Sequence, residues 1–327
     1  MKAARLTGPK KISFEDAPIP EIKSSQSLIK LHYVSICGSD IRHAYGPVLP
    51  EEEYPLKLGN PCHELVGTIA ETRSEKFKEG QRVIVLPSEE SSGGLVEYIA
   101  GDEDKIALLP EHGDLKEWMM CQPSGTVLYA CQQIGTILGK TVLILGQGGI
   151  GLSFSAICAR AGASKVIATD LFDYRLEYAK KFGATHTINP NSESIDEAIT
   201  EITQGQGADI TIEAAGYPES LNTSIRLVKK FGKVILFGIQ DGFNNKTVSL
   251  DTQYILPKAA TIIPTAGGSS GDSIGHINRM IELKDRGWWN PGEMITHNSS
   301  FESANDAYEM YENRTVSYTH LTLPPKA

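Results

Sequence analysis

The chain has 327 residues, of which 40% are hydrophobic and 22% are charged, and its formal net charge is −9. These values are typical of a folded globular protein, exclude collagen and disorder, and argue against nucleic acid or an anionic membrane as the main partner. Five cysteines are too few for a disulfide scaffold and suit a reducing compartment. The length favours two domains, since domains commonly have about 100 to 200 residues.

The sequence shows neither a membrane segment nor a secretory leader. No apolar run approaches the roughly 18 residues that a membrane helix needs. The opening Met1-Lys2-Ala3-Ala4-Arg5-Leu6 is not followed by the apolar stretch of a signal peptide. We therefore expect a cytoplasmic protein.

The first 123 residues predict an irregular β-rich segment. Short β-type runs at 27–34, 64–71, 82–86 and 94–100 are separated by proline, glycine and clusters of charge. Such runs are typical of strands joined by long loops.

From about residue 124, apolar strands alternate with amphipathic helices. This alternation predicts βαβ units and a parallel sheet covered on both faces. Two further helical stretches, 273–285 and 303–312, follow. The predicted strands are 141–145, 165–169, 210–213, 233–238 and 260–264, and the predicted helices between them are 149–161, 174–182 and 218–230.

A glycine-rich turn, Gly146-Gln147-Gly148-Gly149-Ile150-Gly151, follows the first of these strands. GxGxxG spacing alone also occurs in other βαβ turns, but a preceding strand and a following helix are the context of a dinucleotide-binding motif. Gly146 would allow the tight turn, Gly148 the approach of a pyrophosphate, and Gly151 close packing of helix on strand. Gly149 and Ile150 open the helix whose amide groups would bind phosphate.

Asp170 ends the next strand, 19 residues after Gly151, close to the roughly 20 expected for the acidic residue that reads the adenosine ribose. Its carboxylate can accept hydrogen bonds from the ribose hydroxyls and would repel a 2′-phosphate, which favours NAD over NADP. Arg175 either flanks this ribose and weakens the preference or faces solvent.

A second group of residues has the chemistry of metal ligands. His63 and Glu64 follow Cys37 by 26 and 27 residues within the β-rich segment. Thiolate, imidazole and carboxylate are ligand types of zinc. By itself the pattern is weak, because a lone cysteine in an apolar strand is usually a core residue.

Together, these motifs resemble the zinc-containing medium-chain dehydrogenase/reductase superfamily of alcohol and polyol dehydrogenases. The resemblance covers almost the whole chain. It implies an α/β fold in which a doubly wound Rossmann domain, 124–268, is inserted in a discontinuous, β-rich GroES-like catalytic domain, 1–123 and 269–327. The residues that carry it are Met1-Lys2-Ala3-Ala4, Cys37-Gly38-Ser39-Asp40, His63-Glu64, Gly94-Leu95-Val96-Glu97-Tyr98, Gln122-Pro123, the turn Gly146 to Gly151, Asp170 and Glu213-Ala214-Ala215-Gly216.

The resemblance implies roles for the metal motifs. Cys37 and His63 match the first two ligands of a catalytic zinc, and Glu64 matches an adjacent carboxylate that lies behind the ligands or joins them. Ser39 matches the hydroxyl that takes the substrate proton. Asp40 matches the carboxylate that orients the ligand histidine.

Other positions match less directly. In the family's proton relay a histidine often follows the cysteine by five residues; that position is Arg42 here, and His43 comes one later. Thr126 matches the residue that packs on the nicotinamide. Gly238 and Ile239, at the end of a predicted strand, are expected to contact the nicotinamide as well.

The third zinc ligand is open between alternatives. The family has a cysteine or glutamate at the position that aligns with Gln122, and a glutamine can coordinate only through a neutral amide oxygen. The register through Pro123 and Thr126 favours Gln122, whereas a shift of one residue would present Cys121, otherwise a buried core thiol. Cys62 could also serve as a ligand, or Cys37, His63 and Glu64 could form the site without a fourth protein ligand.

A structural zinc site is not expected. Many relatives carry a lobe with four closely spaced cysteines, but this chain has no cysteine between Cys62 and Cys121. Coordination by four thiolates is therefore impossible there. We expect one zinc per subunit.

The implied reaction is reversible oxidation of an alcohol or polyol to a carbonyl compound, with hydride transfer to NAD⁺ and zinc as Lewis acid. The alternatives are a zinc-independent reductase of the same superfamily, acting on quinones or activated double bonds, and a catalytically inactive NAD-binding protein. Small polar residues at 269, 270 and 272 favour a polyol or a hydroxy-amino acid over a long aliphatic alcohol as the substrate. The family also implies a homodimer or homotetramer.

The end of the chain departs from the family pattern. Relatives usually return with a strand that contains Lys-Val, whereas this chain runs from Thr315 to Ala327 through Pro324-Pro325. Its β-branched residues permit an ordinary divergent strand. We predict instead a foreign or read-through terminus that is poorly packed from about residue 317.

Overall fold

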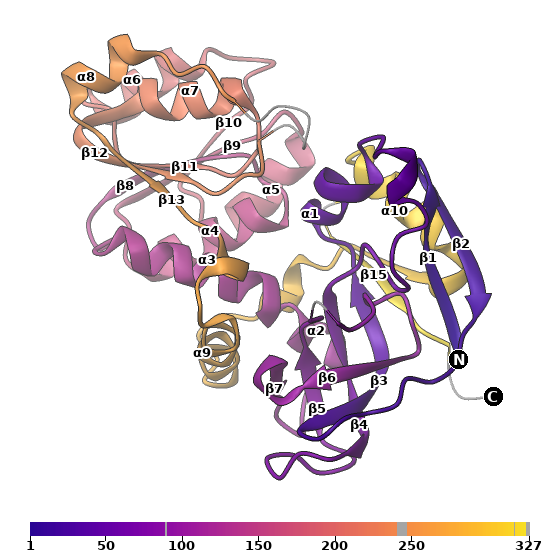
Figure 1. The fold of residues 1–327 in the computed structure, drawn as a ribbon. Helices are drawn as coiled ribbons and strands as arrows, with labels where there is room; N and C mark the ends of the chain where they lie inside the picture. Colours follow the sequence, from indigo (N-terminus) through magenta and orange to yellow (C-terminus); the bar gives the residue numbers. More distant parts are fainter. Residues whose placement is uncertain (89, 241–246, 317, 325–327) are drawn as a thin grey trace. The chain divides into compact units, whose positions relative to one another are not determined.

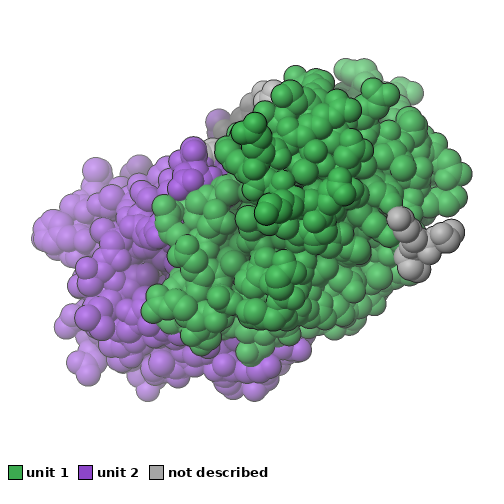
Figure 2. All heavy atoms as spheres, turned by 90° about the horizontal axis from the view of Figure 1, so that it is seen from below, with its two compact units in different colours: residues 1–123, 274–327 green, residues 124–273 purple. Residues whose placement is uncertain are grey.

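The structure, a computed structural model, describes residues 1–88, 90–240, 247–316 and 318–324, without the side chain of Ser269. The chain divides into two compact units, one formed by 1–123 with 274–327 and the other by 124–273, which Figure 2 shows in different colours. Among the described residues, no helix is long and apolar enough to cross a membrane.

The unit 124–273 is built on a six-stranded sheet in which every neighbouring pair is parallel (Figure 1). The strand order β10-β9-β8-β11-β12-β13 switches between β8 and β11, which is the topology of doubly wound dinucleotide-binding sheets. The central strands are runs of buried apolar residues because both faces are covered. The strands are β8 (Thr141–Leu145), β9 (Lys165–Thr169), β10 (His186–Ile188), β11 (Ala208–Glu213), β12 (Val228–Leu236) and β13 (Thr261–Pro264).

Helices flank both faces of this sheet (Figure 1). A side chain caps the free amide groups at the start of two of them. The Ser194 side chain accepts a hydrogen bond from the backbone N–H of Glu197 in α6 (Ile195–Thr203), and that of Asp251 accepts one from Gln253 in α8 (Thr252–Lys258). The helices are α3 (Cys121–Ile134), α4 (Gly149–Arg160), α5 (Asp173–Lys181), α6 (Ile195–Thr203), α7 (Pro218–Leu227) and α8 (Thr252–Lys258), with a 3₁₀ turn, η4, at Gly267–Ser269.

The unit 1–123 with 274–327 contains a mostly antiparallel seven-stranded sheet and a separate hairpin. The sheet runs in the order β14-β15-β3-β4-β5-β7, with β6 paired to β3, and the hairpin is β1-β2. The strands are β1 (Lys2–Gly8), β2 (Lys11–Asp16), β3 (Gln26–Ser35), β4 (Glu64–Thr72), β5 (Arg82–Val85), β6 (Tyr98–Asp102), β7 (Ile106–Leu108), β14 (His297–Ser300) and β15 (Thr319–Thr322).

Short helices lie against this sheet and close its core. Buried side chains of β1, β3, β4 and β5 pack with those of the last helix, α10, including Tyr308. The helices are α1 (Gly38–Asp40), α2 (Leu115–Met119), α9 (Ser273–Asp285) and α10 (Ala304–Glu312), with a π-helical turn η1 (Ile41–Tyr45) and 3₁₀ turns η2 (Glu51–Glu53), η3 (Glu103–Lys105), η5 (Pro291–Met294) and η6 (Phe301–Ser303).

The predicted fold class is confirmed: one unit contains a doubly wound parallel sheet and the other is a separate, mostly antiparallel, β-rich unit. The predicted strands 141–145 and 165–169 and the predicted helix 273–285 agree with the observed bounds. The β-type run 94–100 becomes a strand only from Tyr98, because Ala3 forms an isolated bridge with Val96 and the ladder with β3 starts later.

The prediction of a poorly packed terminus is wrong for the described residues. Thr319–Thr322 forms β15, which pairs with β14 on one side and with β3 on the other. Tyr318 and Leu321 are buried, and so is Leu323. The prediction failed because alternating apolar residues can complete a sheet whatever the origin of the segment; the foreign origin itself stays a prediction.

Truncation of Leu321 tests this packing. Leu321 is fully buried in the core, whereas the next residue, Thr322, is exposed. We expect Leu321→Ala to lower the free energy of unfolding by about 2 to 5 kcal/mol, as for other buried leucines. Thr322→Ala should change it by less than about 0.5 kcal/mol. Chemical denaturation of both variants decides, and equal small effects would mean that the segment does not pack.

Candidate metal centre and dinucleotide site

Three side chains from two separate segments of the β-rich unit meet. Cys37 precedes α1, and His63 and Glu64 lie where the chain enters β4. One ligand atom from each of these residues lies within 4.8 Å of the others, which makes them the one group of this kind among the described histidines, cysteines and acidic residues. The structure therefore brings together the thiolate, imidazole and carboxylate that the sequence singled out.

Asp40 holds this group from behind. Its Oδ1 lies 2.6 Å from Nδ1 of His63, and its Oδ2 accepts hydrogen bonds from the backbone N–H of Cys37 at 3.0 Å and from the hydroxyl of Tyr308 at 3.3 Å. Burial lowers the pKa of His63, but the neighbouring carboxylate of Asp40 outweighs it and raises that pKa well above its usual value. With Nδ1 bound to Asp40, Nε2 of His63 is the nitrogen left for a ligand.

Ser39 lies between the sulfur and the imidazole. Its hydroxyl is 3.1 Å from Sγ of Cys37 and 3.2 Å from Nε2 of His63. Burial, followed by the charge of Glu64, raises the pKa of the Cys37 thiol in the metal-free protein. A cation at this place would have the opposite effect, since a metal deprotonates a coordinating thiol.

Glu64 is a buried carboxylate held by a tyrosine. The hydroxyl of Tyr318 lies 2.9 Å and 3.1 Å from its two oxygens and donates to them. Burial raises the pKa of Glu64, and the charge of His63 opposes that rise. Neither a lysine nor an arginine is among the described groups that shift this pKa, and a buried carboxylate in such surroundings suits a site that takes up a cation.

The two alternative third ligands differ in position. Gln122 lies in α3, and its side-chain oxygen is buried and has no hydrogen-bond partner among the described residues. The thiol of Cys121, next to it, does not belong to the group formed by the three residues above, and burial raises its pKa. The geometry thus separates Cys121 from the metal group and leaves the Gln122 oxygen available.

His43 lies in the π-helical turn η1, directly after Asp40 and α1. Burial lowers the pKa of His43, and the charge of His63 lowers it further. Arg42, which stands where relatives often have the relay histidine, occupies the same turn. The structure therefore places both candidates for the outer end of a proton path beside the metal group, in the same turn.

The glycine-rich turn has the geometry of a phosphate-binding loop. Gly146 has φ +93°, and a Cβ there would lie 3.0 Å from Cα of Ala215; a Cβ on Gly151 would lie 1.8 Å from the carbonyl oxygen of Gly146. A Cβ on Gly148 would meet no other atom within 4 Å. Gly148 is the residue directly before α4, and no side chain caps the start of that helix. The first amide groups of α4, including those of Gly149 and Ile150, are therefore free of a capping side chain.

Asp170 follows β9 and faces this turn. Its Oδ2 accepts the backbone N–H of Gln147 at 2.7 Å, and its Oδ1 accepts that of Phe172 at 3.0 Å. Arg175 does not face solvent: its guanidinium lies 3.6 Å from the Asp170 carboxylate and over the rings of Phe172 and Tyr174. The alternative in which Arg175 faces solvent is therefore wrong, and its flanking of a ribose stays a prediction.

Three further predicted residues lie at the carboxyl edge of the parallel sheet. Gly238 and Ile239 follow β12, and a Cβ on Gly216, in the next loop, would lie 2.4 Å from the carbonyl oxygen of Ile239. Thr126 of α3 packs against Gly267 so closely that a Cβ on Gly267 would lie 2.4 Å from its Cβ. Ser269, one of the polar residues expected to favour a polyol, has a side chain that lies outside the described part of the structure.

Sequence reasoning missed two tyrosines that complete the metal group. Tyr308 sits in an amphipathic helix, where an aromatic residue indicates only core packing, and Tyr318 lies in the segment expected to be unpacked. Both donate hydroxyl hydrogens to carboxylates of the group. A signal for Tyr308 was absent, because its partner Asp40 is 268 residues away in the sequence.

A dinucleotide-type sheet together with a Cys–His–Glu group is typical of an oxidoreductase of the dehydrogenase class. Comparison with known proteins supports this class. Residues 23–127 match the family described as alcohol dehydrogenase GroES-like domain, and residues 149–283 match the family described as zinc-binding dehydrogenase.

The relatives agree over nearly the full length of the chain. Sorbitol dehydrogenase of Bacillus subtilis is 29% identical over 338 residues, which cover 94% of this chain and 93% of that protein. A probable D-xylulose reductase A of Emericella nidulans is 28% identical, with 93% and 91% covered. The crystal structure of 2R,3R-butanediol dehydrogenase from Bacillus subtilis shares the fold with a TM-score of 0.83, at 22% identity and 99% coverage of both chains.

The chain belongs to the zinc-containing medium-chain dehydrogenase/reductase family of alcohol and polyol dehydrogenases, as the resemblance implied.

Proposed function

We propose that this protein is an NAD-dependent zinc dehydrogenase that interconverts a polyol or other alcohol and its carbonyl compound. The observation that carries the proposal is the group Cys37, His63 and Glu64, with Asp40 bound to the far nitrogen of the imidazole. Structural ion pairs seldom combine a thiol, an imidazole and two carboxylates in one place, whereas zinc sites do.

The donor set fits one catalytic zinc. Cys37, His63 and Glu64 would hold the ion, and the unpaired oxygen of Gln122 is the candidate for a fourth protein contact, direct or through water. Cys121 is the alternative that the geometry favours less. When bound, zinc supplies a Lewis acid that lowers the pKa of an alcohol. No structural zinc is expected, because the chain lacks the second group of cysteines.

The protein's own residues handle the proton. Ser39, within hydrogen-bond distance of both Cys37 and His63, is placed to accept the hydroxyl proton of an alcohol that enters the metal group. His43 or Arg42 in η1 would pass it outward. Asp40 keeps the imidazole of His63 in one tautomer, so that it does not compete for this proton.

The unit 124–273 would bind NAD as the dinucleotide domain. Gly146 to Gly151 would bind the pyrophosphate with backbone amides, Asp170 would accept hydrogen bonds from the adenosine ribose, and Arg175 would lie beside that ribose. Thr126, Gly238 and Ile239 would contact the nicotinamide. The bound NAD⁺ accepts the hydride.

The relatives suggest the substrate class. Their names specify sorbitol, xylulose and butanediol, all of which carry neighbouring oxygen functions. We therefore favour a polyol over a simple aliphatic alcohol. Assembly as a homodimer or homotetramer in the cytoplasm is part of the same proposal, and the five free thiols fit a reducing compartment.

A second candidate is a zinc-independent reductase of the same family, or an NAD-binding protein without activity. The neutral amide of Gln122, at a position where relatives have a charged ligand, favours this reading. The complete Cys37–His63–Glu64 group argues against it.

A substrate panel tests the proposal. The purified protein with NAD⁺ should reduce the cofactor in the presence of sorbitol, xylitol or butanediol, and far less with ethanol. Reduction of quinones with NADPH, and no turnover of any alcohol, would instead support the zinc-independent reductase.

A further inference from the structure

Glu213 is a buried carboxylate at the carboxyl end of β11 that no step above uses. It is the last residue of that strand, and its side chain has no exposed surface. We propose that Glu213 is a positioning residue for the nicotinamide half of the cofactor, because it ties together the loops that follow β11 and β12. The inference rests on the proposed use of NAD.

The carboxylate of Glu213 accepts four hydrogen bonds. Its Oε1 accepts the backbone N–H groups of Ala215 at 2.9 Å and Gly216 at 2.7 Å and the hydroxyl of Ser220 at 2.6 Å. Its Oε2 accepts the side-chain amide of Gln240 at 2.7 Å. Burial raises the pKa of Glu213, and these four donors oppose that rise by favouring the ionised form.

The two loops meet closely at this carboxylate. The backbone N–H groups of Phe237 and Gly238 donate to the carbonyl oxygen of Glu213 at 3.1 Å and 2.9 Å. A Cβ on Gly238 would lie 2.5 Å from Oε2 of Glu213 and 2.5 Å from the backbone nitrogen of Gly216. The glycines thus leave space for the carboxylate and for no further side chain.

The order of the strands indicates which half of the dinucleotide these loops would meet. Asp170 follows β9, and the loop of Gly146 follows β8 and touches Ala215, which follows β11. A dinucleotide whose ribose is at Asp170 and whose pyrophosphate is at the glycine-rich turn continues across the carboxyl ends of β11 and β12. These ends are the loops that Glu213 holds.

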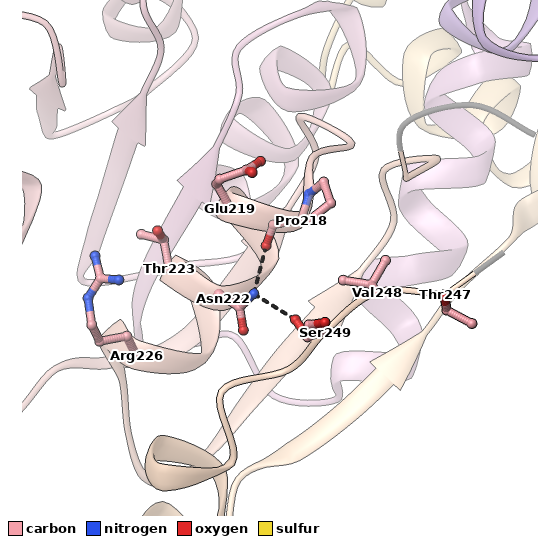
Figure 3. A pocket seen from close by; sticks show the side chains of 8 residues that line it. All are labelled: Pro218, Glu219, Asn222, Thr223, Arg226, Thr247, Val248 and Ser249. Carbon is pink, nitrogen blue, oxygen red and sulfur yellow. Dashed lines mark hydrogen bonds between the residues drawn. The ribbon is translucent and has the colours of Figure 1, made fainter. Parts of the chain in front are cut away.

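The pocket beside α7 has no such link to the cofactor. It is an open hollow of about 520 Å³ lined by polar and apolar residues of α7 and by residues 247–249, and Asn222 bridges its two walls (Figure 3). Arg226 on its rim is paired with Asp196, so its charge is already satisfied within the unit.

Glu213→Ala tests the inference through binding rather than turnover. NADH carries the nicotinamide half, and ADP-ribose lacks it. We expect the Kd of NADH to rise by about tenfold, which is the loss of about one well-placed interaction, while the Kd of ADP-ribose changes by less than about twofold. Fluorescence titration of NADH and calorimetry of ADP-ribose give the two values.

Two variants separate positioning from general damage. Glu213→Gln should bind NADH nearly as the wild type. The oxygen of the new side-chain amide can accept the same three hydrogen bonds, and its NH₂ group can donate to the side-chain oxygen of Gln240 once that amide has turned over. Asp209, at the opposite end of β11, accepts the backbone N–H of Thr141 at 2.8 Å and pairs with Lys229. Asp209→Ala should lower the melting temperature without changing the ratio of the NADH and ADP-ribose affinities.

Equal weakening of NADH and ADP-ribose in Glu213→Ala, or no change in either, would overturn the inference. If that variant does not fold, Gln240→Leu removes only the bond that joins the second loop, and it should weaken NADH selectively as well; no selective loss there would overturn the inference. A wild type that binds neither ligand would refute the proposed use of NAD instead.

Discussion

Replacing Cys37 with serine is expected to remove zinc and alcohol-dependent turnover together, while NAD⁺ still binds. Serine keeps the size of the side chain but lacks the thiolate, the strongest ligand of the group with His63 and Glu64. We expect turnover to fall by about a thousandfold or more, equivalent to about 4 kcal/mol, within the several kcal/mol that a Lewis acid supplies. Elemental analysis and an absorbance assay on one preparation measure both losses.

Cys121→Ser is the matched control, because it makes the same change in a thiol outside the metal group. It should retain zinc and most of the activity. Loss of zinc in this variant would show that Cys121 completes the site. Loss of NAD⁺ binding in Cys37→Ser would contradict the separation of the metal group from the dinucleotide site.

Replacing Asp170 with alanine is expected to raise the KM for NAD⁺ by about ten- to a hundredfold and to relax discrimination against NADP⁺. The ribose would lose hydrogen bonds to a charged acceptor, each worth about 1.5 to 3 kcal/mol. The negative charge that repels a 2′-phosphate disappears as well, and the positive charge of the Arg175 guanidinium, 3.6 Å from the Asp170 carboxylate, would attract that phosphate. Steady-state kinetics with both cofactors measure the change.

Asp173→Ala controls for the loss of a nearby carboxylate, since Asp173 begins α5 and bonds to Asn189 rather than to the glycine-rich turn. It should leave both KM values within about twofold of the wild type, as is usual for a surface substitution. In the double variant Asp170→Ala with Arg175→Ala, the gained use of NADP⁺ should disappear. Unchanged kinetics in Asp170→Ala would mean that the ribose is bound elsewhere.

Much of the parallel sheet could be predicted from local pattern. The strands 141–145 and 165–169 are continuous apolar runs flanked by glycine or charge, and such runs have few alternatives in a soluble α/β chain. The hairpin of β1 and β2 was missed because its apolar runs are short and interrupted by charged residues. The short β15 depends on pairing with β3 across more than 280 residues, which no local pattern encodes, and β14 in turn pairs with β15.

The candidate ligands of the metal group and the carboxylate of Asp40 behind them were predictable, but the tyrosines that hold its carboxylates were not. Residue type and the family resemblance singled out Cys37, His63 and Glu64, and the structure brings their ligand atoms together. The hydroxyls that hold the two carboxylates come from Tyr308 and Tyr318, which approach only through tertiary packing. The same limit applies to Glu213, whose partners lie in two loops separated by a helix and a strand.

Zinc-dependent hydride transfer to NAD⁺ is the central claim, and activity measured against zinc content tests it most directly. The purified protein is stripped with a chelator and reloaded with zinc in steps, and NADH formation with a responsive polyol is recorded at each step. We predict that activity rises in proportion to bound zinc and reaches its maximum at one ion per subunit. Activity that does not depend on zinc, or that requires a second ion, would contradict this account.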